Sequence, residues 1–282
     1  MSIQRKPVLF ITLLILALLA GSAAAQTCPC PAVPAEPEPL SIEVLNAYPH
    51  DPDSFTQGLL LHEGTFYESA GQYGQSDLRQ VEVETGEILR KVELNERFFA
   101  EGLTLVTGRT LGATALPDVL IQLTWRERTA IVWSLESFEP VGSYLYETEG
   151  WGICFDGERL LMSDGTSNLY VRDPGTFQLM AMIPVLMNGA PVRDLNELEC
   201  VGGDVYANIW QTDTIVRIDT ATGVVTGIID ASSLLTADER AALAGGAVLN
   251  GIAYAPETDT FYITGKLWPR LFEVRFVADE GS

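Results

Sequence analysis

A short phrase recurs five times along the chain, and its spacing constrains the fold more than any other feature. Each copy places a variable polar or aromatic residue directly before a glycine or leucine: Gln57-Gly58, Glu101-Gly102, Trp151-Gly152, Glu197-Leu198 and Asn250-Gly251. The second members of these pairs are 44, 50, 46 and 53 residues apart. Repetition at a period of ~40–50 residues is the sequence signature of a repeat architecture. The chain is therefore predicted to build one structural unit five times.

Each unit contains further strand patterns after the phrase. A turn ends the first strand, and second strands are predicted over residues 65–70, 119–124, 160–163, 205–209 and 260–264. Alternating apolar residues then predict third strands, for example over residues 78–83 and 215–218, and Thr-Gly turns lead from there to a short fourth strand. Four short strands in a unit of this length are typical of a blade of a β-propeller.

The two ends of the chain indicate how the ring of blades closes. The fifth unit has room for one more strand, over residues 271–276, while residues 41–46 form a strand without a unit of its own. Pairing the two leaves no open sheet edge. The prediction is an all-β, five-bladed β-propeller whose N-terminal strand completes the last blade; a TIM barrel would need about eight helices. The single predicted helix starts at a capping box, Thr236 to Glu239, and either covers the channel mouth or decorates the surface.

The N-terminus has the order of a secretory signal. Arg5 and Lys6 precede an apolar run over residues 8–19, and small residues follow up to Ala25. The run is short for a membrane span, so we expect cleavage and export to the periplasm or the extracellular space, with an uncleaved anchor as the alternative. The expected regions are a signal peptide over residues 1–25, a proline-rich linker over 26–40 and the propeller over 41–282.

Charge and cysteine content limit the partners. A net charge of −21 repels nucleic acid and anionic lipid, so neither is expected as a partner and the chain is expected to be monomeric. The histidines and cysteines lack the spacing of a zinc site, and neither a metal nor an organic cofactor is expected. Export permits disulfides. Cys154 and Cys200, however, have the same register in neighbouring units, so their side chains are expected to point the same way and not to pair.

The variable positions of the repeat are the candidate site, because the first strands of a propeller surround one channel. They are Gln57, Glu101, Trp151, Glu197 and Asn250, and the ends of the second strands add Gly71, Trp125, Gly165, Trp210 and Lys266. An unpaired ammonium among apolar neighbours is costly, so Lys266 indicates a built site. Glu101 and Glu197 would also admit a glycosidase with two carboxylates. A propeller that binds a peptide or sugar without catalysis is the other alternative.

Several longer phrases carry a family likeness. They occupy residues 49–59, 101–104, 150–152, 195–199, 207–213, 249–253 and 264–269. Together they resemble the plant and bacterial glutaminyl cyclases, the papaya-type glutaminyl-peptide cyclotransferases. The resemblance implies a five-bladed propeller, unrelated to the zinc-dependent animal enzyme, that acts on peptides or proteins with an N-terminal glutamine.

The resemblance also implies roles for individual residues. The catalytic acid–base glutamate of the family falls on Glu101, and its pocket residues fall on Phe55, Gln57, Phe99, Trp125, Trp151, Asn196, Trp210 and Lys266. Extra residues around 108–118 lengthen the hairpin that leads to Trp125. Aromatic neighbours should raise the pKa of the Glu101 carboxyl by desolvation. Indole N–H groups of Trp151 or Trp210, or the amides of Gln57 or Asn196, would stabilise an oxyanion.

Overall fold

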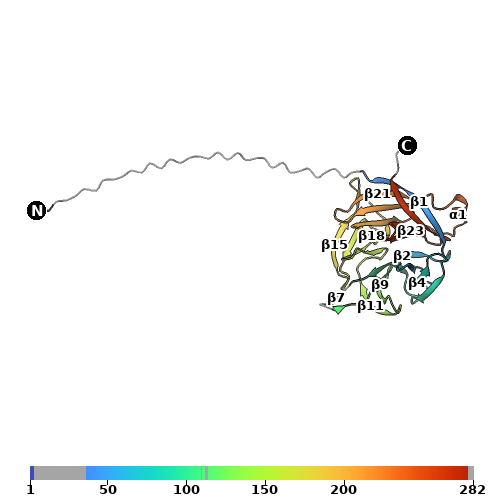
Figure 1. Ribbon diagram of the computed structural model, residues 1–282. Coiled ribbons are helices and arrows are strands. Elements are labelled where there is room, and N and C mark those ends of the chain that lie inside the picture. Colours follow the sequence, from blue (N-terminus) through green and yellow to red (C-terminus); the bar gives the residue numbers. More distant parts are fainter. Residues whose placement is uncertain (3–35, 109, 112–113, 279–282) are drawn as a thin grey trace. The chain divides into compact units, whose positions relative to one another are not determined.

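Strands make up nearly all of the regular structure (Figure 1). The computed structural model describes residues 1–2, 36–108, 110–111 and 114–278. Within these ranges the chain forms strands β1 to β24 and one helix, α1, which confirms the predicted all-β class. The expected signal peptide and most of the expected linker, including Cys28 and Cys30, lie outside the described residues.

Three antiparallel sheets of four strands follow one another along the chain. The first contains β2 (Thr56–His62), β3 (Thr65–Ala70), β4 (Asp77–Glu82) and β5 (Ile88–Glu93). The second contains β6 (Ala100–Val106), β9 (Val119–Thr124), β10 (Thr129–Ser134) and β11 (Pro140–Leu145). The third contains β12 (Ile153–Phe155), β13 (Leu160–Met162), β14 (Asn168–Arg172) and β15 (Leu179–Pro184). In each sheet the strands are adjacent in the order of the sequence, which is the predicted meander.

A larger sheet contains ten of the remaining strands. Its path is β18 (Leu195–Val201), β19 (Asp204–Ile209), β20 (Thr214–Asp219), β21 (Val224–Asp230), β1 (Glu38–Pro49), β24 (Arg270–Ala278), β23 (Thr260–Gly265) and β22 (Leu249–Ala255). The hairpin of β16 (Leu186–Met187) and β17 (Ala190–Pro191) attaches to β21. β1 runs antiparallel along β24 and adds a short parallel pairing with β21. The N-terminal strand therefore pairs with the C-terminal strand as predicted, although it begins at Glu38 and not at residue 41.

Burial falls from the first strand of a sheet to the fourth. β2 and β6 are buried over most of their length, whereas β5, β11 and β15 are largely exposed. The first strands contact one another in a closed cycle, from β2 to β6, β12, β18 and β22 and back to β2. The starts of these strands therefore converge, and residues far apart in the sequence meet there.

The glycine of the repeated phrase is required by this convergence. A Cβ atom on Gly102 would lie 2.7 Å from the carbonyl oxygen of Trp151, to which the Gly102 N–H donates a hydrogen bond of 2.7 Å. A Cβ atom on Gly58 would overlap the backbone of Leu103. Only a residue without a side chain allows first strands of neighbouring sheets to approach this closely.

Two insertions depart from the four-strand pattern. The predicted helix is present as α1 (Ala237–Ala242), and both hydrogen bonds of the capping box between Thr236 and Glu239 are formed. None of the residues of α1 is buried, and Arg240 forms an ion pair of 3.1 Å with Asp213; the helix is therefore exposed, and none of its residues lines the cavity described below. Between β6 and β9 the chain adds the hairpin of β7 (Thr110–Leu111) and β8 (Thr114–Ala115), which accounts for the long connection before Trp125.

Cys154 and Cys200 form a disulfide, so the expectation that they would not pair is wrong. They lie on β12 and β18, and their Cα atoms are 5.5 Å apart, within the range that a disulfide spans. The prediction assumed that equal register means equal side-chain direction. The two registers in fact differ by one residue, because the strand pairings match Leu198 with Leu103 and Ile252 and not with the glycine of the phrase. Cys200 therefore lies one residue beyond the position that corresponds to Cys154, on the other face of its strand.

Removal of this disulfide is expected to lower the free energy of unfolding by about 2–4 kcal/mol, because the bond closes a long loop of the unfolded chain. The two cysteines are 46 residues apart in the sequence. Urea unfolding of the double variant Cys154→Ser/Cys200→Ser against the oxidised wild type measures the difference. The reduced wild type should behave like the variant. An oxidised wild type with the same free energy of unfolding as the variant would contradict the prediction.

Candidate functional site

One cavity gathers residues from the converging strand ends. It has a volume of about 260 Å³ and is lined by Phe55, Gln57, Phe99, Glu101, Trp125, Trp151, Asn196, Trp210 and Lys266. These are the nine residues that the sequence predicted for the site, and the structure brings all of them together. Gln57, Glu101 and Asn196 lie on first strands, while the others directly precede a first strand or follow a second one.

Aromatic rings form most of the cavity wall and hold one another in place. The ring of Phe99 meets those of Phe55 and Trp125 edge to face, with centroids 6.1 Å and 5.5 Å apart. Trp151 and Trp210 meet in the same manner at 5.4 Å. Edge-to-face contacts are favourable because the positive edge of one ring faces the negative face of the next. The wall is therefore apolar and ordered by its own contacts.

Two glycines from the ends of second strands make room for these rings. A Cβ atom on Gly165 would lie 2.7 Å from the indole of Trp151, and one on Gly71 would lie 2.6 Å from the ring of Phe99. Gly165 also has a φ of +79°, which residues with a side chain rarely adopt. Among the residues at the ends of the second strands, Trp125, Trp210 and Lys266 thus line the cavity. Gly71 and Gly165 instead leave room for the rings of Phe99 and Trp151.

Glu101 is the buried acid of the cavity. Its exposed fraction is only 5%. Burial raises the pKa of its carboxyl well above 4.5; the positive charge of Lys266 lowers this pKa, while the charges of Glu149 and Glu127 raise it further. Among the described residues the carboxyl group makes no hydrogen bond. It is therefore free to exchange a proton with a molecule inside the cavity.

Lys266 is the buried base. Its Nζ atom lies 4.9 Å from the centroid of the Phe55 ring, and 4% of the residue is exposed. Burial lowers the pKa of the ammonium from 10.5 to about 8, and the charge of Glu101 opposes this change. Each of the two groups favours the charged form of the other in a site with little water.

Glu149 is a residue of the site that the sequence analysis missed as a functional group. Its Oε2 atom accepts hydrogen bonds from the indole N–H groups of both Trp125, at 2.7 Å, and Trp151, at 3.2 Å. The N–H of Trp151 is therefore committed to a carboxylate, which corrects its assignment as a donor to an oxyanion. Glu149 stands two residues before Trp151 in the repeated phrase, but no spacing rule indicates that a carboxylate there would reach two indoles.

Glu197 does not line the cavity, contrary to the repeat alignment. Its carboxylate accepts hydrogen bonds from the backbone N–H groups of Leu59, at 3.3 Å, and Ile252, at 2.8 Å. It therefore joins β18 to β2 and β22 and is not paired with Glu101 across the cavity. The same irregularity occurs in β2, β6, β18 and β22, and it places Asn196, not Glu197, at the position that corresponds to Gln57 and Glu101. Asn196 therefore lies in the cavity wall, and its buried Oδ1 atom has no hydrogen-bond partner.

Asn250 also lies beside the cavity and not in its wall. Its side-chain amide donates to the carbonyl oxygen of Thr56 at 2.9 Å and lies 3.5 Å from the Oε1 atom of Gln57. It thus anchors the start of β2. With the Oε1 atom turned toward Asn250, the NH₂ group of Gln57 is the part of that side chain left for a ligand.

A second buried carboxylate, Glu68 on β3, holds the segments that carry two cavity residues. Its Oε1 atom accepts hydrogen bonds of 2.6 Å from the hydroxyls of Ser54 and Thr56, which flank Phe55. The same atom lies 3.2 Å from Nε2 of His50, whose Nδ1 is 2.7 Å from the carbonyl oxygen of Trp268. Glu68 therefore links the start of β2 to the loop that follows Lys266.

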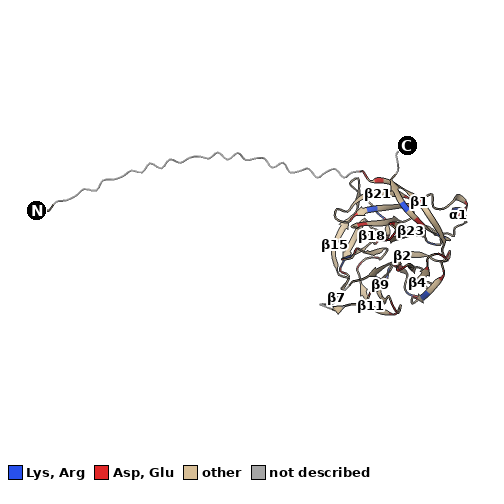
Figure 2. Cartoon of the chain, viewed as in Figure 1, with Lys and Arg blue, Asp and Glu red and all other residues tan. Residues whose placement is uncertain are grey.

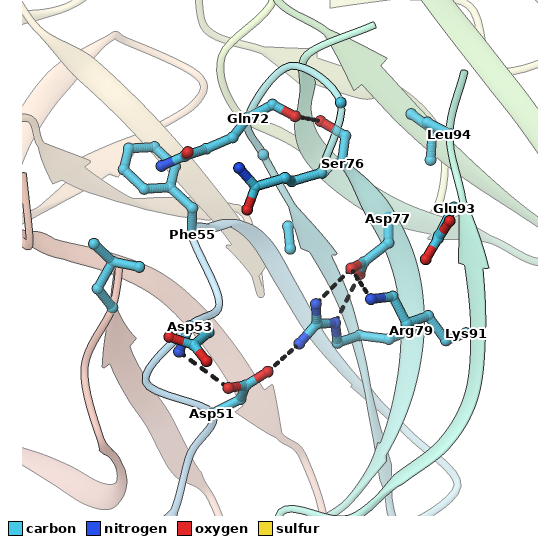
Figure 3. Close-up of a pocket in the computed structure, with 15 residues that line it drawn as sticks. Asp51, Asp53, Phe55, Gln72, Ser76, Asp77, Arg79, Lys91, Glu93 and Leu94 are labelled. Atoms are coloured by element: carbon cyan, nitrogen blue, oxygen red, sulfur yellow. Dashed lines mark hydrogen bonds and ion pairs between the residues drawn. The ribbon is translucent and has the colours of Figure 1, made fainter. Parts of the chain in front are cut away.

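Behind Phe55 lies a second, polar cavity of about 560 Å³ (Figure 3). Its central charges are paired with one another: Arg79 bonds to Asp77 at 2.7 Å and to Asp51 at 2.8 Å, and Lys91 lies 3.1 Å from Asp77. Figure 3 shows these side chains pointing toward one another across the cavity. The ion pairs brace the turn at Asp51 that leads to Phe55, so they support the first cavity from outside.

Two features of the described structure bear on cofactors and membranes. In residues 36–108, 110–111 and 114–278, no group of three or more His, Cys, Asp or Glu side chains is arranged to hold a metal ion. Over the same described part of the chain, no helix has the length and apolar character of a membrane span.

An all-β fold with a single buried carboxyl group in an aromatic cavity defines a site for acid–base chemistry on a small group. The chain belongs to the glutamine cyclotransferase family, whose sequence profile matches residues 12–276. It is 39% identical over 236 residues to a glutaminyl-peptide cyclotransferase of Arabidopsis thaliana, covering 83% of this chain and 71% of that protein. The crystal structure of glutaminyl cyclase from Myxococcus xanthus is similar, with a TM-score of 0.77, 40% identity, and coverage of 87% of this chain and 100% of that one.

Proposed function

We propose that this protein is a glutaminyl-peptide cyclotransferase that converts the N-terminal glutamine of peptides or proteins into pyroglutamate and releases ammonia. The observation that carries the proposal is the enclosure of Glu101 and Lys266 in an aromatic cavity of about 260 Å³, in a chain of the glutamine cyclotransferase family. The cavity is large enough for one glutamine residue at the end of a chain but not for a folded domain.

The reaction is an intramolecular acyl transfer. The α-amine nitrogen attacks the side-chain carboxamide carbon, a C–N bond forms to close the five-membered lactam, and the bond to the departing nitrogen breaks. Glu101 takes a proton from the attacking amine and gives one to the leaving nitrogen, so that ammonia departs and the carboxylate is regenerated. Because the nucleophile and electrophile are already joined, holding them in a near-attack conformation supplies much of the rate enhancement. The aromatic wall performs that task.

Three polar groups are placed to bind the reacting atoms. The indole N–H of Trp210, the NH₂ group of Gln57 and the ammonium of Lys266 line the cavity with Glu101 and would stabilise the oxyanion of the tetrahedral intermediate. The side-chain amide of Asn196 lines the same cavity and would form a hydrogen bond with the substrate. The net charge of −21 attracts the cationic α-ammonium of a peptide; in Figure 2 acidic residues are red and basic residues blue.

We further propose the finer architecture that the sequence predicted. The closed cycle of β2, β6, β12, β18 and β22, each continued by further strands, supports five blades, with β1 as the outer strand of the last. The proposed regions remain a signal peptide over residues 1–25, a linker over 26–40 and the propeller over 41–282. Export, a monomeric state and independence from metals belong to the same proposal.

The pH dependence of kcat is expected to follow Glu101. Only the ionised carboxylate accepts the proton of the amine, so kcat should rise with pH through a pKa well above 4.5. Lys266→Met removes a charge that lowers this pKa, so the acid limb of the kcat profile should move to higher pH. A limb at the pKa of an ordinary glutamate, or one that Lys266→Met leaves in place, would contradict the assignment.

The proposed function is tested by incubating the purified protein with a peptide that begins with glutamine. Ammonia release coupled to loss of one ammonia from the peptide mass supports it. A matched peptide that begins with asparagine should not react, because the ring would be one atom smaller. Binding of the glutamine peptide without ammonia release would leave a non-catalytic propeller, and release of sugar from a glycoside would indicate the glycosidase alternative.

A further inference from the structure

We propose that Glu149 is a positioning residue that holds the two indoles of Trp125 and Trp151 as one rigid wall of the cavity. The inference rests on the proposed function, since it assigns a role in the same reaction. Glu149 does not line the cavity, so it does not touch the substrate and acts through the two tryptophans.

Three side chains donate hydrogen bonds to the carboxylate of Glu149. A single oxygen, Oε2, accepts a hydrogen bond of 2.7 Å from Trp125 and one of 3.2 Å from Trp151. The other oxygen accepts from Nε of Arg126 at 3.3 Å. The guanidinium of Arg126 in turn lies 3.8 Å from the centroid of the Trp125 ring. Trp125 is thus held through its N–H group and covered on one face by the same ion pair.

Glu149 links the indoles of two sheets whose backbones are joined at the same place by the hydrogen bond from the Gly150 N–H to the Trp125 carbonyl oxygen, at 3.1 Å. Trp125 follows β9 and Trp151 precedes β12, so the two indoles belong to neighbouring sheets. Trp125 contacts Phe99, and Trp151 contacts Trp210, each edge to face. All four rings are therefore oriented, directly or through one neighbour, by a single carboxylate. A near-attack conformation depends on such a wall, because misplacement of about 1 Å costs about 10²-fold in rate.

Glu149 also contributes its charge. Burial raises the pKa of its carboxyl, but the hydrogen bonds from the two indoles and Arg126 outweigh burial and lower it, so the group is ionised at neutral pH. The other charged or titratable groups that interact with Glu101 are Lys266, Glu127, Tyr73 and Tyr146. The negative charge of Glu149 raises the pKa of Glu101, as does that of Glu127. The effect of the Glu149 side chain on the position of the indoles and the effect of its charge on the pKa of Glu101 can be measured separately, because different substitutions remove them.

Two variants distinguish the positional effect of Glu149 from the effect of its charge. Glu149→Asp keeps the charge but shortens the side chain by one methylene group, so the oxygen no longer reaches both indoles. We expect kcat/KM to fall by about 10²-fold, the near-UV circular dichroism of the tryptophans to change, and the acid limb of kcat to stay in place. Glu149→Gln keeps an oxygen at the same distance without the charge. We expect it to preserve the near-UV spectrum and most of kcat/KM, and to move the acid limb to lower pH.

The matched control is Glu158→Gln, which removes one negative charge from an exposed turn between β12 and β13 and should change none of these quantities. A Glu149→Asp variant with the kcat/KM and near-UV spectrum of the wild type overturns the positioning role. So does a loss of activity in Glu149→Asp without any change in that spectrum. If the wild type itself releases no ammonia, the proposed function fails, while the spectra of the two variants still report whether Glu149 orients the indoles.

Discussion

Replacement of Glu101 by glutamine is expected to lower kcat for the cyclisation of glutamine peptides by about 10²–10⁴-fold, the range that general acid–base catalysis contributes. Glutamine has the same shape as glutamate but can neither accept the proton of the amine nor return one to ammonia. KM should change little, because the aromatic wall and the polar groups around the substrate stay in place. Steady-state ammonia release at saturating peptide measures the loss.

The fold of this variant is expected to be retained. Glutamine leaves Lys266 without the charge of Glu101, but burial opposes that charge, and among the described residues the Glu101 carboxyl makes no hydrogen bond that would be lost. Near-UV circular dichroism and urea unfolding check this point. Glu158→Gln serves as the control, since it removes an exposed carboxylate outside the cavity. Cyclisation by Glu101→Gln at the parental rate would remove Glu101 from the acid–base role.

Replacement of Glu68 by alanine is expected to lower the free energy of unfolding by about 3–5 kcal/mol, the cost of breaking a buried ion pair. The substitution leaves His50 without its carboxylate and the hydroxyls of Ser54 and Thr56 without their acceptor. Since these residues flank Phe55, kcat/KM should fall as well. Glu87→Ala, at an exposed position in the turn before β5, should change stability by no more than about 0.5 kcal/mol.

The contribution of Glu68 should depend on pH with a defined sign. Burial raises the pKa of its carboxyl, but the charges and hydrogen bonds of His50, Arg79 and Ser54 lower it from 4.5 to about 2. A carboxyl whose folded-state pKa is lowered stabilises the fold above its unfolded pKa and loses this effect as pH falls toward the folded value. The difference in free energy of unfolding between the wild type and Glu68→Gln should therefore shrink between pH 4.5 and about 2. A difference that stays constant over this window would contradict the prediction.

Much of the fold was predictable because strands and turns leave local signals. The second strands β3 and β9 begin and end at the predicted residues, and the capping box of α1 is formed. The pairing of the N-terminal strand with β24 followed from the absence of any other partner for either end. The start of β1 was placed too late because proline-rich sequence obscured the three residues that pair with β21.

The repeat alignment and the family resemblance predicted different parts of the site. The repeat alone placed Gln57, Glu101 and Trp151 correctly in the cavity, since their glycine neighbours mark the close approach of first strands. It failed on the fifth copy, where Asn250 lies beside the wall, and on the fourth copy, where Glu197 stands in the place of the glycine and the alignment on Leu198 is one residue off. The family resemblance supplied Asn196 in its place. A repeat alignment transfers position around a ring, but a shift of one residue turns a side chain to the other face.

The sequence by itself determined the all-β class and the order of the strands, because strand periodicity and turn residues are local properties of a chain. Its resemblance to a known family indicated the nine residues that line one cavity. Only the tertiary structure decided which side chains are paired or hydrogen-bonded within the protein and which can contact a substrate. The pairing of Cys154 with Cys200, the committed carboxylate of Glu197 and the hold of Glu149 on two indoles depend on distances between sheets. Such distances arise only when distant segments pack, and no local pattern records them.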